Sequence, residues 1–238
     1  VRGNIHLTKV DSEYPDNKLT GATFEVYKDS NGSGKLDDGD ELLGTLTEKE
    51  IGSYEIKDLF YGRYFVKETK APEGFVLDTG VYEVMIDTNG KTCEVENKAG
   101  VGFINEAMRG NLKIVKTSSD GKVKGFAFRI TGANGYDIIL ETNDKGEIVI
   151  DGIRIGDYTI SEVSNSASAM YVLPADKKAT VKTGSTTIVE MHNVLRDTPK
   201  TGDATNLPLL YALAGLSAVG IAVTAFVGFK KKKKEGND

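Results

Sequence analysis

The chain has 238 residues, of which 27% are charged and 39% are hydrophobic, and its formal net charge is −5. This length allows one or two domains with their own cores, and the acidic balance argues against a nucleic-acid-binding protein. The single cysteine, Cys93, excludes a disulfide framework and a cysteine-rich zinc site. Two histidines, His6 and His192, leave little material for histidine-based catalysis.

An internal repeat divides most of the chain. The similar segments are Arg2–Lys9 (RGNIHLTK) with Arg109–Lys116 (RGNLKIVK), and Leu59–Glu68 (LFYGRYFVKE) with Ile153–Glu162 (IRIGDYTISE). Self-similarity at this spacing indicates two copies of one folding unit. We therefore expect two domains, residues 3–108 and 109–196.

Both domains have the pattern of short β-strands. Apolar and polar residues alternate with a period of two, and turns rich in Gly, Asn and Asp recur, for example at residues 87–90, 131–135 and 143–146. Many short strands per ~100 residues are typical of a β-sandwich. We expect an all-β fold with two tandem sandwiches.

The first domain contains a candidate calcium loop at residues 29–40 (DSNGSGKLDDGD). Oxygen ligands at positions 1, 3 and 5, a glycine at position 6 and a carboxylate at position 12 match the pattern of a calcium-binding loop. A polar, glycine-rich hairpin loop is the alternative interpretation. The candidate ligands are Asp29, Asn31, Ser33, Lys35 through its carbonyl, Asp37 and Asp40.

Polar residues of three types lie on the core-facing side of the predicted strands. Side chains two positions apart share a face of a strand, so Lys9 lies on the same face as Ile5 and Leu7. Burying an unpaired charge costs several kcal/mol, so a sequence that does this in both domains needs a reason. The same parity places five further residues on apolar faces: Glu68, Asn105, Lys116, Glu162 and Asn193.

Burial of these groups together favours a chemical reaction between them. An apolar site drives Lys towards its neutral, nucleophilic amine and Glu towards its protonated acid. A neutral amine beside an Asn carboxamide that is polarised by the acid can attack it, expel ammonia and form an amide. A Lys–Glu ion pair without a covalent bond is the alternative.

Residues 64–75 (YFVKETKAPEGF) resemble the E-box of the Cna B-type (SpaA-like) domains of Gram-positive adhesins and pilins, and residues 7–11 (LTKVD) resemble their lysine strand. The resemblance covers residues 3–196. It implies immunoglobulin-like or prealbumin-like sandwiches, many of which carry an autocatalytic Lys–Asn isopeptide bond. The second domain lacks the Ala-Pro-x-Gly turn of the E-box.

Carried over by position, the resemblance implies one crosslink in each domain. Asn97 shares a face with Cys93 and Val95 and is an alternative partner for the first lysine. We prefer Asn105, which stands just before the Arg-Gly linker. The implied sets are Lys9 with Asn105 and the catalytic Glu68, and Lys116 with Asn193 and the catalytic Glu162.

A charge-free segment follows the two domains. Residues 207–229 are mostly apolar and would form a helix of about 34 Å, which is long enough to cross a membrane. The basic tail at residues 230–234 favours the cytoplasmic side, which would place residues 1–201 outside the cell. We expect this single transmembrane helix to follow the sandwiches.

A short motif precedes this segment: Thr198, Pro199, Lys200, Thr201 and Gly202. Together with the apolar span and the basic tail, it resembles the cell-wall sorting signal of Gram-positive surface proteins, although the usual first residue of that signal is Leu. The resemblance implies cleavage by a sortase between Thr201 and Gly202. It also implies transfer of Thr201 to peptidoglycan, so residues 197–238 would be the sorting signal.

These features predict a non-enzymatic stalk of a sortase-anchored cell-wall adhesin. The alternatives are a minor or basal subunit of a sortase-assembled pilus and the C-terminal anchor of a wall-bound enzyme. Expected partners are the sortase, peptidoglycan, the membrane before processing, and a host ligand or other pilins. No cofactor is expected apart from the candidate calcium. The chain lacks an N-terminal secretion signal, so we expect it to be part of a longer precursor.

Overall fold

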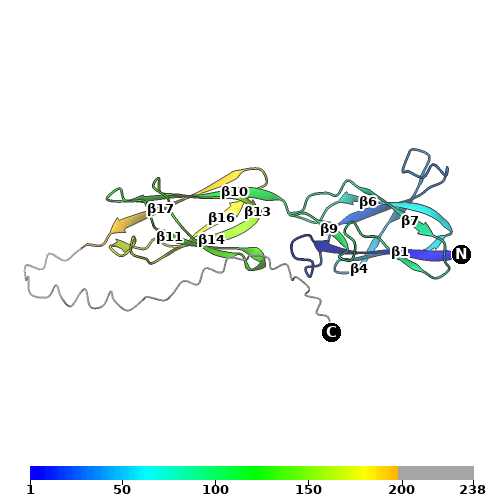
Figure 1. Cartoon of the computed structure of the whole chain (residues 1–238), viewed down its shortest axis with the longest axis horizontal. Helices are drawn as coiled ribbons and strands as arrows, with labels where there is room; N and C mark the ends of the chain where they lie inside the picture. Colours follow the sequence, from blue (N-terminus) through cyan, green and yellow to red (C-terminus); the bar gives the residue numbers. More distant parts are fainter. Residues whose placement is uncertain (198–238) are drawn as a thin grey trace, which may run out of the picture. The chain divides into compact units, whose positions relative to one another are not determined.

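The computed structural model describes residues 1–197, which fold entirely as β-structure apart from one short 3-10 turn (Figure 1). The all-β prediction is confirmed. The predicted transmembrane helix at residues 207–229 lies outside the described residues. Within residues 1–197, no helix has the length and apolar character needed to cross a membrane.

The first sandwich is built from two sheets. One has the strand order β4-β5-β1-β8, with β9 also paired to β1, and the other has the order β3-β2-β6-β7. Its strands are β1 (Arg2–Asp11), β2 (Thr23–Lys28), β3 (Glu41–Thr45), β4 (Thr47–Glu50), β5 (Ser53–Phe60), β6 (Gly62–Lys70), β7 (Val81–Ile86), β8 (Thr92–Glu94) and β9 (Phe103–Asn105).

The second sandwich repeats this plan with sheets in the orders β13-β10-β17-β15 and β12-β11-β14-β16. A 3-10 turn, η1 (Ala133–Gly135), precedes β12. Its strands are β10 (Arg109–Ser118), β11 (Ala127–Thr131), β12 (Asp137–Glu141), β13 (Glu147–Arg154), β14 (Gly156–Val163), β15 (Tyr171–Val172), β16 (Lys177–Val181) and β17 (Thr186–Leu195).

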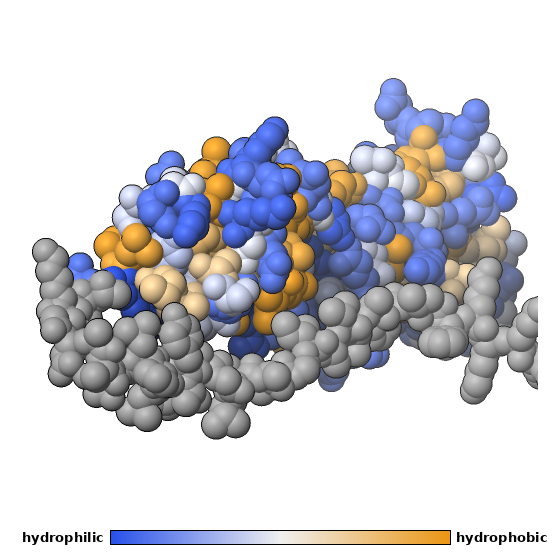
Figure 2. All heavy atoms as spheres, turned by 60° about the vertical axis from the view of Figure 1, so that its left-hand side comes forward, coloured by the Kyte–Doolittle hydropathy of each residue, from blue (hydrophilic) through white to orange (hydrophobic). Residues whose placement is uncertain are grey.

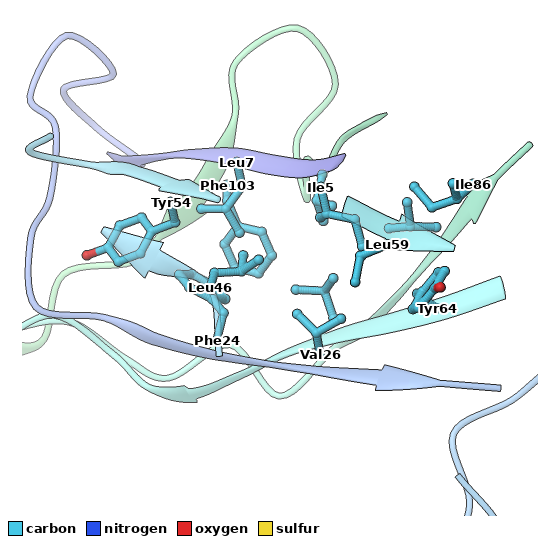
Figure 3. Packing of buried hydrophobic residues seen from close by; sticks show 13 residues of the cluster. Ile5, Leu7, Phe24, Val26, Leu46, Tyr54, Leu59, Tyr64, Ile86 and Phe103 are labelled. Atoms are coloured by element: carbon cyan, nitrogen blue, oxygen red, sulfur yellow. The ribbon is translucent and has the colours of Figure 1, made fainter. Parts of the chain in front are cut away.

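Each sandwich encloses a separate apolar core. Figure 3 shows Ile5 and Leu7 of β1 facing Phe24 and Val26 of β2, with Phe103 between the two layers. Phe103 packs edge-on against Phe24, with ring centroids 5.0 Å apart. Such pairs add to the free energy gained from burial alone. The second core uses the corresponding residues of β10, β11 and β17, among them Leu112, Ile114, Phe128 and Met191.

Hydrophilic residues cover much of the face shown in Figure 2, with apolar side chains between them. Three exposed apolar residues of the second sandwich are Ile139, Val149 and Ile188. Ile148 and Val189, which adjoin Val149 and Ile188 in their strands, are buried, as the period of two requires.

The repeated Arg-Gly-Asn segment has a structural explanation. In the first sandwich, the Arg2 guanidinium donates to the Asp58 carbonyl at 3.1 Å, and the Asn4 amide oxygen accepts the Asp58 N–H at 3.2 Å. Between them, a Cβ on Gly3 would lie 2.8 Å from the Lys91 carbonyl oxygen, so only glycine fits. The segment therefore holds an irregular turn of β5 in place.

The second sandwich contains the same arrangement. Arg109 donates to the Gly152 carbonyl at 2.5 Å, and the Asn111 side chain accepts the Gly152 N–H at 3.0 Å. The residue at the turn has a positive φ in both cases, 59° at Asp58 and 62° at Gly152. This conformation favours glycine over aspartate.

Candidate functional site

The core of the first sandwich contains three polar side chains, two of which lie against the third. Lys9 on β1 and Glu68 on β6 are fully buried, and Asn105 on β9 is 3% exposed. The Lys9 Nζ lies 3.7 Å from Glu68 Oε1, and the Asn105 amide donates to Glu68 Oε2 at 2.8 Å. Glu68 therefore stands between the amine and the carboxamide.

Strand pairing explains why these residues meet. Strand β9 pairs in parallel with β1, with Lys9 opposite Phe103 and Asp11 opposite Asn105. The Lys9 N–H donates to the Gly52 carbonyl at 2.7 Å, and its ammonium donates to the Phe103 carbonyl at 3.0 Å. These contacts fix the backbone and the end of the lysine.

Burial shifts both ionisable groups towards their neutral forms. Desolvation lowers the pKa of Lys9 to about 8, against the opposing charges of Glu68 and Asp78. Desolvation also raises the pKa of Glu68, although hydrogen bonds from Asn105 and the Asp78 N–H oppose the change. A neutral amine and a protonated carboxyl are the forms that amide formation needs.

Two atoms at this site are buried without hydrogen bonds. Within residues 1–197, neither Glu68 Oε1 nor Asn105 Oδ1 has a partner. Buried polar atoms are normally paired, so each exception needs an explanation. Glu68 Oε1 is the carboxyl oxygen that lies 3.7 Å from Lys9 Nζ, so the unpaired oxygen is the one nearer the amine.

The second sandwich brings the corresponding residues together: Lys116 on β10, Glu162 on β14 and Asn193 on β17 are all buried. The Asn193 amide donates to Glu162 Oε1 at 2.7 Å. Glu162 Oε2 and Asn193 Oδ1 lack partners among the described residues, as their counterparts do. Desolvation again lowers the pKa of the lysine and raises that of the glutamate.

The lysine of the second site points elsewhere. Its Nζ donates to the Thr117 carbonyl at 2.5 Å and lies 4.1 Å from the centre of the Phe126 ring. No ion pair within 4.0 Å links it to Glu162 in the described part of the chain. A Lys116 amine that joins Asn193 would give up this hydrogen bond to the Thr117 carbonyl.

Of the two asparagines proposed as partners of Lys9, only Asn105 hydrogen-bonds to Glu68 in residues 1–197. Asn97 is half-buried and accepts the Ile104 N–H at 2.6 Å while donating to the Ile104 carbonyl at 2.8 Å. Asn97 thus closes the connection between β8 and β9. It also donates to Asp78 Oδ2 at 2.7 Å.

Sequence reasoning missed Asp78. This residue lies in the connection between β6 and β7, and its N–H donates to Glu68 Oε2 at 2.8 Å. A connection without periodic burial gives no parity from which its direction could be read. Its place ten residues after the E-box glutamate is the available sequence signal.

The candidate calcium loop is held by its own hydrogen bonds. Asp37 accepts from the Asn31 amide at 2.8 Å, and Asp40 accepts backbone N–H groups of Ser30 and Asp37. Asp29 lies 3.5 Å from the Arg63 guanidinium. In the described residues, no group of three or more His, Cys, Asp or Glu side chains is arranged to hold a metal ion. Calcium binding stays a prediction. The sorting motif Thr198–Gly202 lies outside the described residues.

Comparisons with known proteins agree with this architecture. The family described as "SpaA: Prealbumin-like fold domain" matches residues 3–99 and 110–195. The chain is 26% identical over 194 residues to the trypsin-resistant surface T6 protein of Streptococcus pyogenes, covering 68% of this chain and 34% of the relative. The chain thus spans about a third of the length of this curated relative.

Two solved structures are similar to this chain, and the first of them shares its fold. The Bacillus anthracis TIE protein matches 82% of this chain and 34% of its own, with a TM-score of 0.59 and 24% identity. GBS52, the minor pilin of Streptococcus agalactiae, matches 84% of this chain and 99% of its own, with a TM-score of 0.39 and 18% identity. With the family match covering both sandwiches, the chain belongs to the SpaA prealbumin-like domain family.

Proposed function

We propose that this chain is a structural part of a bacterial surface protein and that each sandwich seals itself with a Lys–Asn amide bond. Support comes from the buried Lys–Glu–Asn sets, from the family match and from the similarity to a streptococcal surface protein. The paired sets carry most weight, because two sandwiches bury the same three groups and leave the same atoms unpartnered within residues 1–197.

The proposed reaction uses the three groups of the first site. The neutral Lys9 amine attacks the side-chain carbonyl carbon of Asn105, and a C–N bond forms as the bond to the amide nitrogen breaks. Glu68 donates its proton to the carboxamide oxygen and then transfers a proton from the attacking amine to the leaving nitrogen. As the carbonyl re-forms, Glu68 takes back the proton from its oxygen. The products are a secondary amide and one ammonia, and Glu68 regains its starting form.

An ion pair without a bond is the weaker interpretation. A structural ion pair normally satisfies its remaining lone pairs with further hydrogen bonds. Here the Lys9 Nζ to Glu68 Oε1 distance is 3.7 Å, and Glu68 Oε1 accepts no hydrogen bond in residues 1–197. A buried oxygen without a hydrogen bond is unfavourable in a permanent ion pair, so we favour the reaction.

The position of the bond would serve a load-bearing stalk. Lys9 lies on the first strand and Asn105 on the last strand of the first sandwich, and these strands pair in parallel. A pull on the two ends would pass through the amide and leave the remaining strands unloaded. In the chain-entropy model, closing a loop of ~100 residues stabilises a fold by about 4–5 kcal/mol.

Intact mass of residues 1–196, which form one compact unit, tests the proposal. We expect a mass below the calculated value by two molecules of ammonia, one from each sandwich. Tryptic peptides should contain Lys9 joined to Asn105, and Lys116 joined to Asn193. A mass equal to the calculated value would overturn the self-sealing proposal.

Anchoring is the second part of the proposal. The sequence supports it through the order of the Thr198–Gly202 motif, an apolar span and five lysines. Incubation of the full chain with a sortase and an amine nucleophile should give a product that ends at Thr201 in amide linkage. A Thr201→Ala variant is the matched control and should stay intact. Equal processing of both chains would contradict this part.

A further inference from the structure

Asp78 is held in place by a set of donors beside the first site. Its carboxylate accepts the Gly80 N–H at 2.6 Å, the Tyr82 hydroxyl at 2.9 Å and the Asn97 amide at 2.7 Å. Burial opposes its ionisation, but these donors outweigh burial and hold its pKa below the usual range. Asp78 is therefore a fixed negative charge at neutral pH.

The same residue contacts the proposed acid. The Asp78 N–H and the Asn105 amide both donate to Glu68 Oε2, each at 2.8 Å. A cleft of about 410 Å³ opens here, and its wall includes Asp78, Asn97 and Asn105. Asp78 thus borders both the acid and the carboxamide.

Four titratable groups face one another at this point: Lys9 of β1, Glu68 of β6, Tyr82 of β7 and Asp78. Burial raises the pKa of Tyr82 to about 12, with Asp78 adding to the increase, so Tyr82 stays neutral as a donor. The charge of Asp78 raises the pKa of Lys9 and that of Glu68. Its charge thus acts in the same direction on both reacting groups.

We propose that Asp78 is a positioning residue of the crosslinking site, which orients Glu68 through its N–H and sets the protonation of the Lys9–Glu68 pair through its fixed charge. This inference rests on the proposed self-sealing reaction. The charge keeps a proton on Glu68 at higher pH than burial and the other contacts alone would allow. The same charge raises the pH at which Lys9 loses its proton.

The sign of the effect follows. The reaction needs neutral Lys9 and protonated Glu68 together, so its rate has a bell-shaped dependence on pH. Removing the charge of Asp78 lowers both pKa values, and both limbs of the bell move to lower pH. An uncharged residue in place of Asp78 removes one charge near Lys9 and Glu68. We therefore expect the pH profile to shift by about one pH unit.

The test uses residues 1–196 made by cell-free synthesis, which is stopped before the pH is set. Ammonia loss in each sandwich is followed by the mass of its tryptic crosslink from about pH 5 to about pH 10, a range that includes the lowered pKa of Lys9, about 8. Asp78→Asn should move the whole profile of the first sandwich to lower pH. Asp87→Asn, an exposed acid of the same sandwich, is the matched control and should leave it unchanged.

The second sandwich provides an internal control for the rate of crosslinking, because its own crosslink forms in the same molecule. Asp78→Ser retains a hydroxyl acceptor for the Gly80 N–H and serves as a second uncharged variant. It should give the same shift, and circular dichroism checks that both variants fold. A lower rate with an unmoved pH profile in a folded variant would mean a purely structural role and would overturn the inference. Absence of the first crosslink from the wild type would overturn the self-sealing proposal instead.

Discussion

The two sandwiches contain the same three groups in different states of readiness. Both lysines donate to a backbone carbonyl, Lys9 to Phe103 and Lys116 to Thr117, but within residues 1–197 only Lys9 lies within 4.0 Å of its glutamate, at 3.7 Å. The auxiliary acids also differ. Asp78 acts on both Lys9 and Glu68, while Asp120, held by the Tyr171 hydroxyl at 2.6 Å, raises the pKa of Lys116. The two sandwiches thus share the Lys, Glu and Asn groups, while the neighbouring acids set the pKa values of these groups differently.

The largest expected effect separates the two bonds. Glu68→Gln keeps the shape of the acid but removes its proton-transfer role, so the first sandwich should retain its ammonia and lose about 4–5 kcal/mol of unfolding free energy. Glu162→Gln should do the same to the second sandwich alone. Intact mass and thermal unfolding measure both outcomes. Glu190→Gln, an exposed change, is the control.

The rates of sealing should differ next. Lys9 lies 3.7 Å from its acid, whereas no ion pair within 4.0 Å joins Lys116 to Glu162 in the described residues, so we expect the first sandwich to seal about tenfold faster. A time course of crosslinked peptides after cell-free synthesis measures this difference. Phe126→Leu removes the ring beside the Lys116 ammonium and should reduce the difference in sealing rate between the two sandwiches. Phe128→Leu should leave this difference unchanged. Equal rates in the wild type would contradict the comparison.

Two glycines test how firmly each lysine strand is held. A Cβ on Gly52 would lie 2.8 Å from the Lys9 carbonyl oxygen, and a Cβ on Gly146 would lie 2.8 Å from that of Lys116. Both have a positive φ, and so do the open positions Gly90 and Gly184, which serve as matched controls. Changing the controls to alanine should cost about 1 kcal/mol, and Gly52→Ala or Gly146→Ala about 2–3 kcal/mol, because a clash is added to backbone strain. Equal losses in chemical denaturation would show that the contact with lysine has no role.

The smallest effect concerns the irregular turn held by the Arg-Gly-Asn segment. Asp58→Gly should stabilise the first sandwich by about 0.5 kcal/mol, because glycine adopts the positive φ without a side-chain clash. The reverse change in the second sandwich, Gly152→Asp, should destabilise it by about 1 kcal/mol. Urea unfolding of each variant measures the sign. The same sign for both changes would contradict the equivalence of the two turns.

Strand periodicity was enough to predict much of the site. Lys9 and Lys116 follow two apolar residues of the same parity, and burial along β1 and β10 alternates as that parity requires. The same reasoning predicted the inward direction of Glu68 and Glu162. Period two works here because each sheet has one face in the core.

Other features of the site depend on contacts that cannot be predicted from the alternation of residues along a strand. Asn97 and Asn105 both fit inward positions, and the distinction lies in the path of the 97–104 connection, where Asn97 bonds to both backbone groups of Ile104. Asp78 lies in an irregular connection. The displaced amine of Lys116 depends on a side-chain rotamer, which strand alternation does not specify.

The pairing of the first strand with the last also sets when a sandwich can be sealed. Lys9 and Asn105 are brought together by the pairing of β9 with β1, and almost the whole domain lies between them in the sequence. Before the bond forms, the polypeptide is a linear chain that can be fully extended. After the proposed reaction, the crosslink closes a covalent loop in the chain. Only molecules that have folded would carry this loop.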